Sequence, residues 1–224
     1  MRDRKMAFDF VGTIYADHNG SAAIRTRLDE LLARHGQNGR MINVGAGSTR
    51  LHERMINVEI EQGPNTDVVA SATALPFEDG SVDLAVTQEV LEHVAEPGAA
   101  MREIHRVLRP GGSAYVQLPF IIGDHRCPDD FTRYTSQGIV ELARQAGFDD
   151  IELHTSVGPA VGAYRIGVEF LAILGSRIAP GLYRYAKGAA ALLLFPLKWL
   201  DPLLRGHPQA YRIAGGFFIV ATKR

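Results

Sequence analysis

The sequence predicts an α/β fold with a largely parallel sheet, and two observations carry this prediction. Segments of helical spacing accompany a series of short apolar runs that are typical of strands, at residues 41–44, 55–60, 67–70 and 83–88. The first run ends in the glycine pair Gly45 and Gly47, and ligands of open α/β sheets bind just outside the carboxyl ends of the strands. With 224 residues, 46% of them hydrophobic, the chain has the size of one domain, which we expect to span residues 1–224.

The first predicted helix lies before the glycine pair. Its apolar residues recur at helical spacing, at Ile24, Leu28, Leu31 and Leu32. Ser21 is the expected N-cap and Gly36 the expected end. We therefore expect a helix that covers the sheet and leads into the first strand.

The glycine pair predicts a place where a ligand approaches the backbone, because glycine lacks a Cβ and tolerates positive φ. A plain turn at a strand exit is the structural alternative. A dinucleotide fingerprint would need a third glycine at Arg50 and a full helix before the next strand, and residues 48–54 are too few for that helix. A nicotinamide-linked oxidoreductase is therefore disfavoured. Glu59, at the end of the second strand, could accept hydrogen bonds from a ribose diol, which favours a nucleoside ligand without phosphates.

Three further motifs follow in the order ATALPFEDGSVD at residues 72–83, EVLEHV at 89–94 and RVLRPGG at 106–112. Together with the glycine pair, they make residues 40–155 resemble the class I S-adenosylmethionine-dependent methyltransferases. The resemblance implies a Rossmann-like, doubly wound mixed sheet of seven strands whose last strand is antiparallel. It also implies S-adenosylmethionine as the cofactor and in-line transfer of its methyl group to an acceptor, in which the enzyme mainly supplies position and desolvation.

The same resemblance assigns a set of cofactor-binding residues at the ends of the strands, namely Gly45, Ala46, Gly47, Glu59, Ser71, Ala72, Gln88 and Glu89. Ser71 stands where the family usually has an acidic residue for the adenine amino group, and a hydroxyl brings no charge. Gln88 could offer a donor and an acceptor to the methionyl group.

A loop rich in polar side chains follows the predicted fifth strand, residues 113–118, which a helix over 98–108 precedes. This loop, residues 123–135, is the predicted acceptor side of the site, and His125 is its predicted general base. The predicted substrate-binding residues are Asp130, Arg133 and Tyr134 of the loop, together with His93. Its pattern resembles a bacterial subgroup associated with glycan or glycolipid biosynthesis. No metal site is expected.

Structural roles are the alternative for several of these residues. Arg133 could pair with Asp130, and Thr135 could cap a helix over residues 136–146. His93 lies on a short helix that Pro97 is expected to terminate, where a histidine is more often structural. The loop is therefore a candidate for both stability and chemistry.

The C-terminal part contains an insertion, residues 158–213, between a strand at 151–155 and a last strand at 215–222. Helical spacing over 161–178 and 182–195, interrupted at 179–181, predicts a helical hairpin or lid. Its polar residues form one expected stripe, with Arg184, Lys187, Lys198, Asp201 and Arg205. They leave a wide apolar face, with Leu192, Leu193, Phe195, Trp199 and Leu203. That face predicts either packing against the sheet or a second subunit, as in a homodimer, or contact with an anionic membrane surface.

Composition narrows the function classes. Residues 158–224 carry nine Lys and Arg against two acidic residues, whereas the preceding part is acidic and offers no basic stripe for nucleic acid. Residues 1–20 lack an apolar run, no stretch reaches membrane-spanning length, and Cys127 is the single cysteine, so we expect a cytoplasmic protein, or one peripheral on the inner face of the membrane. The predicted function is methylation of a small or lipid- or glycan-linked acceptor. A cofactor-binding but catalytically silent partner protein is the alternative.

Overall fold

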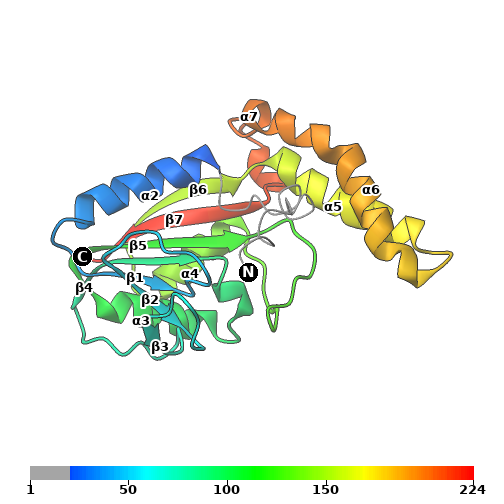
Figure 1. The fold of residues 1–224 in the computed structure, drawn as a ribbon. Coiled ribbons are helices and arrows are strands. Elements are labelled where there is room, and N and C mark those ends of the chain that lie inside the picture. The colour runs from blue at the N-terminus through cyan, green and yellow to red at the C-terminus, as the bar shows by residue number, and fades with distance from the viewer. Residues whose placement is uncertain (1–20) are drawn as a thin grey trace.

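The computed structural model describes residues 21–224 of the chain, so the expectation about a leader in residues 1–20 falls outside the described part. A seven-stranded sheet has the order β3-β2-β1-β4-β5-β7-β6. Its parallel strands are β1 (Met41–Val44), β2 (Met55–Glu59), β3 (Val68–Val69), β4 (Val82–Gln88) and β5 (Leu108–Pro119). The last strand, β7 (Gly216–Thr222), runs antiparallel between β5 and β6 (Asp150–Val157). The predicted mixed sheet with an antiparallel last strand is therefore confirmed (Figure 1).

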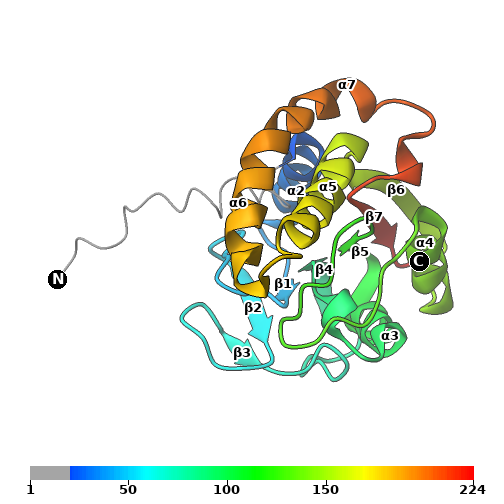
Figure 2. The ribbon, with the colours of Figure 1, turned by 90° about the vertical axis from the view of Figure 1, so that its right-hand side faces the viewer.

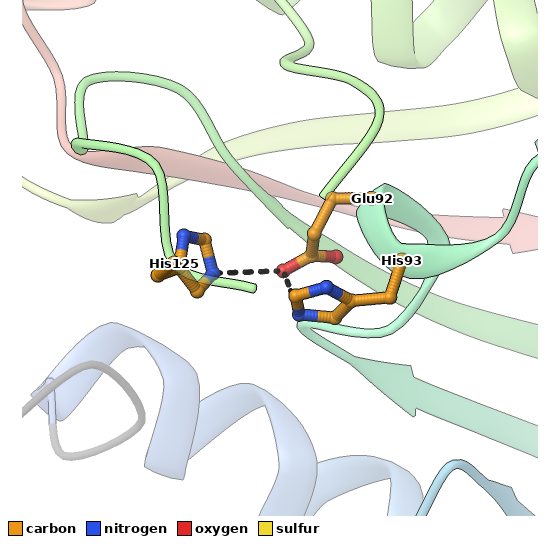
Figure 3. Close-up of side chains that lie close together, drawn as sticks. All are labelled: Glu92, His93 and His125. Atoms are coloured by element: carbon orange, nitrogen blue, oxygen red, sulfur yellow. Dashed lines mark ion pairs between the residues drawn. The ribbon is translucent and has the colours of Figure 1, made fainter. Parts of the chain in front are cut away.

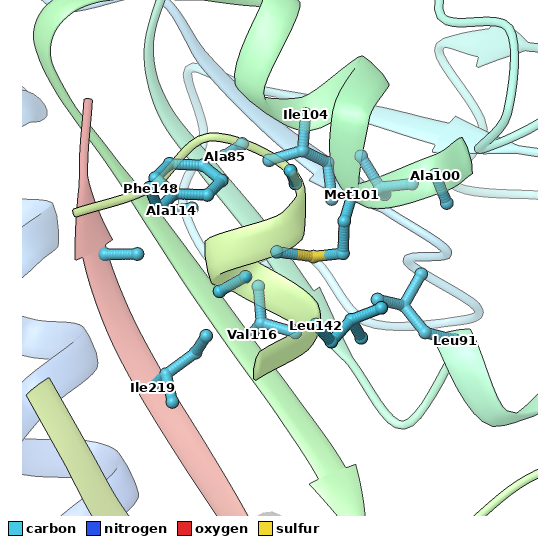
Figure 4. Close-up of a cluster of buried hydrophobic side chains, with 14 of the residues drawn as sticks. Ala85, Leu91, Ala100, Met101, Ile104, Ala114, Val116, Leu142, Phe148 and Ile219 are labelled. Carbon is cyan, nitrogen blue, oxygen red and sulfur yellow. The ribbon is translucent and has the colours of Figure 1, made fainter. Parts of the chain in front are cut away.

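Helices cover both faces of this sheet. On one face lies α2 (Ala22–His35), which buries Ile24, Leu28 and Leu31 against side chains of the central strands. On the other face lie α3 (Pro97–Val107) and α4 (Ser136–Gln145) (Figure 1). The core on that side joins Met101 and Ile104 to Ala85, Val116 and Ile219 of the sheet (Figure 4). The central strands are buried on both faces, which explains why β1 and β4 are almost continuously apolar in the sequence.

The predicted helix caps are present. The Ser21 hydroxyl accepts from the Ile24 N–H at 3.3 Å, and Gly36 is the C-cap of α2. The Thr135 hydroxyl accepts from the Gly138 N–H at 3.0 Å, so Thr135 caps α4 as expected.

Two predicted boundaries were wrong in their detail. Pro97 begins α3 instead of ending the preceding short helix, η1 (Leu91–His93), because proline at the first helical position loses no hydrogen bond. The sequence RPGG was expected to separate α3 from a strand starting at residue 113, but β5 starts at Leu108, directly after the helix. Leu108 pairs with Val82, and the register of β4 and β5 shifts after this pair, so the sheet accommodates the RPGG segment. A hydrogen bond from the Gly111 N–H to the Lys223 carbonyl oxygen, at 2.7 Å, holds the segment in place.

The segment between β6 and β7 forms the predicted helical hairpin. It consists of α5 (Pro159–Gly175), η2 (Pro180–Leu182), α6 (Tyr183–Leu194), η3 (Phe195–Leu200), α7 (Asp201–Leu204) and η4 (Ala210–Arg212). Helices α5 and α6 lie against each other and extend beyond the edge of the sheet at which β5 ends (Figures 1 and 2). Tyr164, Val168, Ala190 and Ala191 form their interior. None of the helices within residues 21–224 is long and apolar enough to cross a membrane.

The hairpin departs from the predicted polar stripe, because several of its charges serve internal contacts. Lys187 pairs with Glu169 across the two helices at 2.6 Å, and Arg205 pairs with Asp201 at 2.8 Å. Asp201 itself is buried. On the apolar side, Leu193, Trp199 and Leu203 are 71%, 72% and 78% exposed and Leu192 is also exposed, whereas Phe195 packs against the interior of the hairpin. The expected apolar face therefore exists without Phe195, and the stripe is not a free basic surface.

Asp201 provides a test of how the two ends of the insertion are held together. Its carboxylate accepts from the N–H groups of Ala160 and Val161 at 3.1 and 3.3 Å, at the start of α5, and from Arg205. Replacing Asp201 with Ala leaves these buried donors unpaired, so we expect the free energy of unfolding to fall by about 1–3 kcal/mol. Urea denaturation measures this change, and Asp201→Asn, which keeps an acceptor, should lose less. Equal stability of Asp201→Ala and the parent chain would contradict the assignment.

Candidate active site

The predicted site residues gather at one edge of the sheet, where the parallel strands end. β1, β2, β4 and β5 are parallel and adjacent, so Val44, Glu59, Gln88 and Pro119 all point to the same edge. The loops that leave these strands carry the glycine turn, the short helix η1 and the His125 loop. This edge is where open α/β sheets bind their ligands.

The two glycines of the turn after β1 have different surroundings. Both have positive φ, 72° at Gly45 and 56° at Gly47, a region that favours glycine. A Cβ at Gly45 would lie 2.3 Å from a methyl carbon of Val90, whereas a Cβ at Gly47 would have no atom within 4 Å. Gly45 is therefore required for packing of the turn against Val90, and the open side that a ligand could occupy is at Gly47. Ala46, between them, is buried.

The turn is tied to the end of β2 through Glu59. The Gly47 N–H donates to the Glu59 carboxylate, and the Gly45 N–H donates to the Val58 carbonyl oxygen at 2.9 Å. A carboxylate has two oxygens with several acceptor positions, so Glu59 can hold the turn with one oxygen and accept from a ligand hydroxyl with the other. The structure thus brings together the two features that the sequence assigned to a ribose.

The connection between β1 and β2 contains turns and no helix, as the spacing predicted. Arg50, which stands in place of a third glycine, donates to the Asp67 carboxylate at 2.9 and 3.0 Å and to the Met55 carbonyl oxygen at 3.0 Å. Arg50 therefore stabilises the connection instead of leaving space for a pyrophosphate at a helix N-terminus.

Ser71 and Ala72 lie just after β3, at the outer side of the same edge. The Ser71 hydroxyl accepts from the Thr73 N–H at 3.2 Å and lies 2.8 Å from the Thr73 hydroxyl oxygen. The hydroxyl thus already serves a local turn, and its contact with an adenine stays a prediction. Ala72 is half-buried and packs against the main core.

A network of amides and a carboxylate lies where β4 and β5 end. Gln117 of β5 is fully buried; its side-chain oxygen accepts from Gln88 at 3.3 Å and from Tyr115 at 3.0 Å, and its amide donates to Glu89 at 3.1 Å. Sequence reasoning missed Gln117, although a glutamine within an apolar strand is a detectable signal. The network fixes the orientation of Gln88, predicted for the methionyl end of the cofactor, and of Glu89, predicted to bind the cofactor.

Glu89 has an unusual backbone and an unusual environment. Its φ of 56° is the only positive value at a non-glycine residue within residues 21–224, and such outliers concentrate at functional sites. Burial and the neighbouring Glu92 carboxylate raise the pKa of Glu89 to about 7, although the hydrogen bond from Gln117 opposes this.

Glu92 and two histidines, His93 and His125, lie close together (Figure 3). His93 follows Glu92 on η1, and His125 comes from the loop after β5; their Nε2 atoms lie 3.7 and 3.8 Å from Glu92 Oε1. The two imidazole rings are edge to face with centroids 5.2 Å apart. The Glu92 carboxylate raises the pKa of His125, and burial partly opposes this shift. The sequence predicted His93 and His125 for the acceptor side but assigned no role to Glu92, and it predicted no metal site where these three potential ligands now lie together.

The loop around His125 is held by Asp130 and Arg133. Asp130 accepts from the His125 N–H at 2.8 Å and from both terminal nitrogens of Arg133 at 2.5 Å. The Arg133 guanidinium holds the pKa of Asp130 well below its usual range. The structural alternative for this pair is thus realised, and both side chains position His125. Tyr134, predicted for substrate binding, is partly buried and packs against the core below the loop.

A hollow of about 390 Å³ lies at the opposite edge of the sheet, lined by polar residues such as His35, Asp83 and Arg109. Asp83 and Arg109 form an ion pair there and the Arg40 N–H donates to Asp83, so these groups hold strand beginnings together. None of the predicted site residues lines this hollow, and we place the site at the carboxyl edge.

Comparison with known proteins finds similarity to methyltransferases. Residues 42–116 match the family model of a methyltransferase domain. An uncharacterized 37.1 kDa protein in transposon TN4556 of Streptomyces fradiae is 30% identical over 207 residues, which cover 81% of this chain and 55% of that protein. The ubiquinone biosynthesis O-methyltransferase of Cupriavidus pinatubonensis is 27% identical over 143 residues, 56% of this chain and 57% of that protein. The chain thus spans little more than half the length of these curated relatives.

A solved structure shares the fold. The crystal structure of a SAM-dependent methyltransferase from Archaeoglobus fulgidus superposes with a TM-score of 0.57 at 12% identity and covers 96% of this chain and 98% of that one. The match of residues 42–116 to a methyltransferase domain and the order of the sheet agree with the resemblance to the class I S-adenosylmethionine-dependent methyltransferases.

Proposed function

We propose that the protein transfers the methyl group of S-adenosylmethionine to a small acceptor molecule. The observation that carries the proposal is the link between the open glycine turn after β1 and the Glu59 carboxylate at the end of β2. The open side at Gly47 is where we expect the ligand, and we expect the second oxygen of Glu59 to accept from the ribose hydroxyls. The residues present therefore fit a nucleoside cofactor without phosphates.

The remaining cofactor residues follow from the order of the strands. Ser71 and Ala72 lie beyond β2 on the adenine side, and Gln88 and Glu89 lie on the other side of the turn, toward the methionyl end. Bound S-adenosylmethionine supplies a methyl group that is already activated on a sulfonium. The protein then mainly positions the two reactants in line and excludes water.

The acceptor side faces the His125 loop. In methyl transfer to a hydroxyl, the bond between sulfur and the methyl carbon breaks as the oxygen–carbon bond forms, and the hydroxyl proton must leave. His125 is the group we assign to this side, since Asp130 and Arg133 fix its position and its Nε2 faces the space beside Glu92. An acceptor with a hydroxyl group is in line with the O-methyltransferase among the relatives.

The experiment that tests this function is incubation with methyl-labelled S-adenosylmethionine and fractionated cell extract. We expect label to enter one chemical fraction, and a Glu59→Ala variant to transfer much less label. Binding of the cofactor without transfer to any fraction would instead favour the alternative of a catalytically silent partner protein.

The hairpin of residues 158–213 supports a narrower proposal about the acceptor. We propose that it is a lid over the carboxyl edge that also lies on an anionic membrane surface and presents a lipid- or glycan-linked acceptor. The hairpin carries exposed apolar side chains, such as Leu193, Trp199 and Leu203, and the exposed cations Arg177 and Arg184, two features that interfacial helices combine. Dimerization through the same apolar face is the other use of such a surface.

Flotation with liposomes containing anionic lipid tests the membrane proposal. At low salt the parent protein should float with the vesicles, and a triple variant with Ser at 193, 199 and 203 should stay in solution, since it loses the apolar contact. Val69→Ser removes an exposed apolar residue outside the hairpin and should float like the parent. If the parent protein stays in the soluble fraction and sedimentation shows that it is a dimer while the triple variant is a monomer, the face is a subunit interface.

A further inference from the structure

We propose that Glu92, His93 and His125 bind a divalent transition-metal cation on the acceptor side of the site. The three side chains come from two segments, η1 and the loop after β5, and their ligand atoms lie within 4.8 Å of one another (Figure 3). Two imidazoles and a carboxylate on one side of a metal ion leave its other coordination positions open for exogenous ligands. The role of the cation rests on the methyl-transfer function proposed above, whereas its binding can be measured independently.

The burial of Glu92 without a hydrogen-bond partner is the strongest indication of a metal site. Its side chain is fully buried, and neither carboxylate oxygen has a hydrogen-bond partner within residues 21–224. The nearest basic groups are the two imidazoles, whose Nε2 atoms lie 3.7 and 3.8 Å from Glu92 Oε1, which is longer than a hydrogen bond. A buried carboxylate is strongly unfavourable unless it is paired, hydrogen-bonded or bound to a metal. A cation between Glu92 and the histidines would provide the positive charge that this buried carboxylate needs.

The histidines are oriented for this role. His93 Nδ1 lies 2.5 Å from the Asp129 carbonyl oxygen, and His125 Nδ1 lies 3.2 Å from the Gly123 carbonyl oxygen. In His93, an Nδ1–H that donates to the carbonyl oxygen leaves Nε2 unprotonated and directs its lone pair to the metal, the usual arrangement around metal-binding histidines. In His125, Nδ1 also lies 3.0 Å from the Arg133 guanidinium, which can only donate, so metal binding at Nε2 requires Nδ1 to keep the bond to Gly123 instead.

The distances suit a cation after a small adjustment. Ligands at about 2.1 Å from a metal at tetrahedral or octahedral angles lie about 3.0–3.4 Å apart. The two Nε2–Oε1 distances of 3.7 and 3.8 Å exceed this range, and all three ligand atoms lie within 4.8 Å of one another, so the side chains must rotate toward a common centre to hold the cation. Nitrogen ligands favour Zn²⁺, Fe²⁺ or Mn²⁺ over Ca²⁺ and Mg²⁺, which take mainly oxygen.

The cation would change the role of His125. As a ligand, His125 would hold the cation instead of acting as general base. A bound cation lowers the pKa of a coordinated hydroxyl, so that it loses its proton to solvent, and also orients the oxygen. The acceptor is then a molecule that offers an oxygen to the metal, and the reaction is O-methylation.

Titration of the metal-free protein with Co²⁺, followed by its visible absorption and by competition with Zn²⁺, tests the site without turnover. We expect one Co²⁺ per chain, and at least about tenfold weaker binding in Glu92→Gln and His125→Asn, because even supporting residues of metal sites matter that much. His125 lies on a partly exposed loop, so His125→Asn decides the case if Glu92→Gln fails to fold. The exposed Cys127 is the control: Cys127→Ser should bind Co²⁺ like the parent.

Three outcomes would overturn the proposal. These are no saturable Co²⁺ absorption in the parent protein, binding that Cys127→Ser abolishes, and binding that both ligand variants leave unchanged. Turnover that is insensitive to a chelator but lost in His125→Asn would return the imidazole to the role of base. Titration of the parent protein and the same variants with S-adenosylhomocysteine separates the two proposals. If the parent protein does not bind S-adenosylhomocysteine, the methyltransferase function is refuted and the metal result still stands.

Discussion

His125→Ala should lose turnover by a factor of about 10² or more while its affinity for S-adenosylhomocysteine stays nearly intact. The imidazole lies on the loop after β5, on the opposite side of β4 from the glycine turn, and it contacts Glu92, Asp130 and Arg133 rather than the predicted cofactor residues. Loss of the side chain therefore removes the group that handles the acceptor proton, whether as base or as metal ligand. Steady-state kinetics and a calorimetric titration on one preparation measure both effects.

A second histidine provides the control for this variant. His154 is also partly exposed, and its ring stacks on Phe218; it lies on β6, the outermost strand, which β7 separates from β5. His154→Ala should retain the turnover of the parent protein. If His125→Ala instead melts early and shows normal specific activity in its folded fraction, the residue only stabilises the loop.

Glu59→Gln should bind S-adenosylhomocysteine at least about tenfold more weakly than the parent protein, because a good hydrogen bond to a charged group contributes about 1.5–3 kcal/mol. The glutamine oxygen can still accept from the Gly47 N–H, so the turn should keep its conformation and the melting temperature should change little. Glu59→Ala should lose the same affinity and also some stability, since the Gly47 N–H loses its acceptor.

The comparison of these two variants separates binding from folding. Reduced affinity in Glu59→Ala with full affinity in Glu59→Gln would mean that the carboxylate only supports the turn and that the ribose is held elsewhere. Gly45→Arg is a poor probe by contrast, because a side chain there would collide with Val90 before it reached the ligand space.

The sequence predicted the sheet and its covering helices because these depend on local patterns. Apolar runs marked the strands, and the cap residues Ser21 and Thr135 marked the helix starts. The same patterns failed where a residue's role depends on a distant partner. Asp201 looked like part of an exposed stripe, but its carboxylate caps a helix that begins about forty residues earlier in the chain.

The candidate site was predictable to a similar degree. The glycines, Glu59 and His125 stand out at strand ends, and the structure places them at one edge of the sheet. Glu92 did not stand out, because a glutamate on a short helix is usually exposed. Its burial follows from the loop after β5, which covers η1 and whose Phe131 N–H donates to the Glu92 carbonyl oxygen at 2.8 Å. Only the folded chain shows that this carboxylate faces two histidines.

Calorimetric titration of the parent protein with S-adenosylhomocysteine, with a nicotinamide dinucleotide as the competing ligand, tests the central claim most directly. We expect one S-adenosylhomocysteine per chain, displaced by S-adenosylmethionine and not by the dinucleotide, because Arg50 and the turn after β1 leave no helix N-terminus for a pyrophosphate. Absence of binding by S-adenosylhomocysteine together with saturable binding of the dinucleotide would contradict the account.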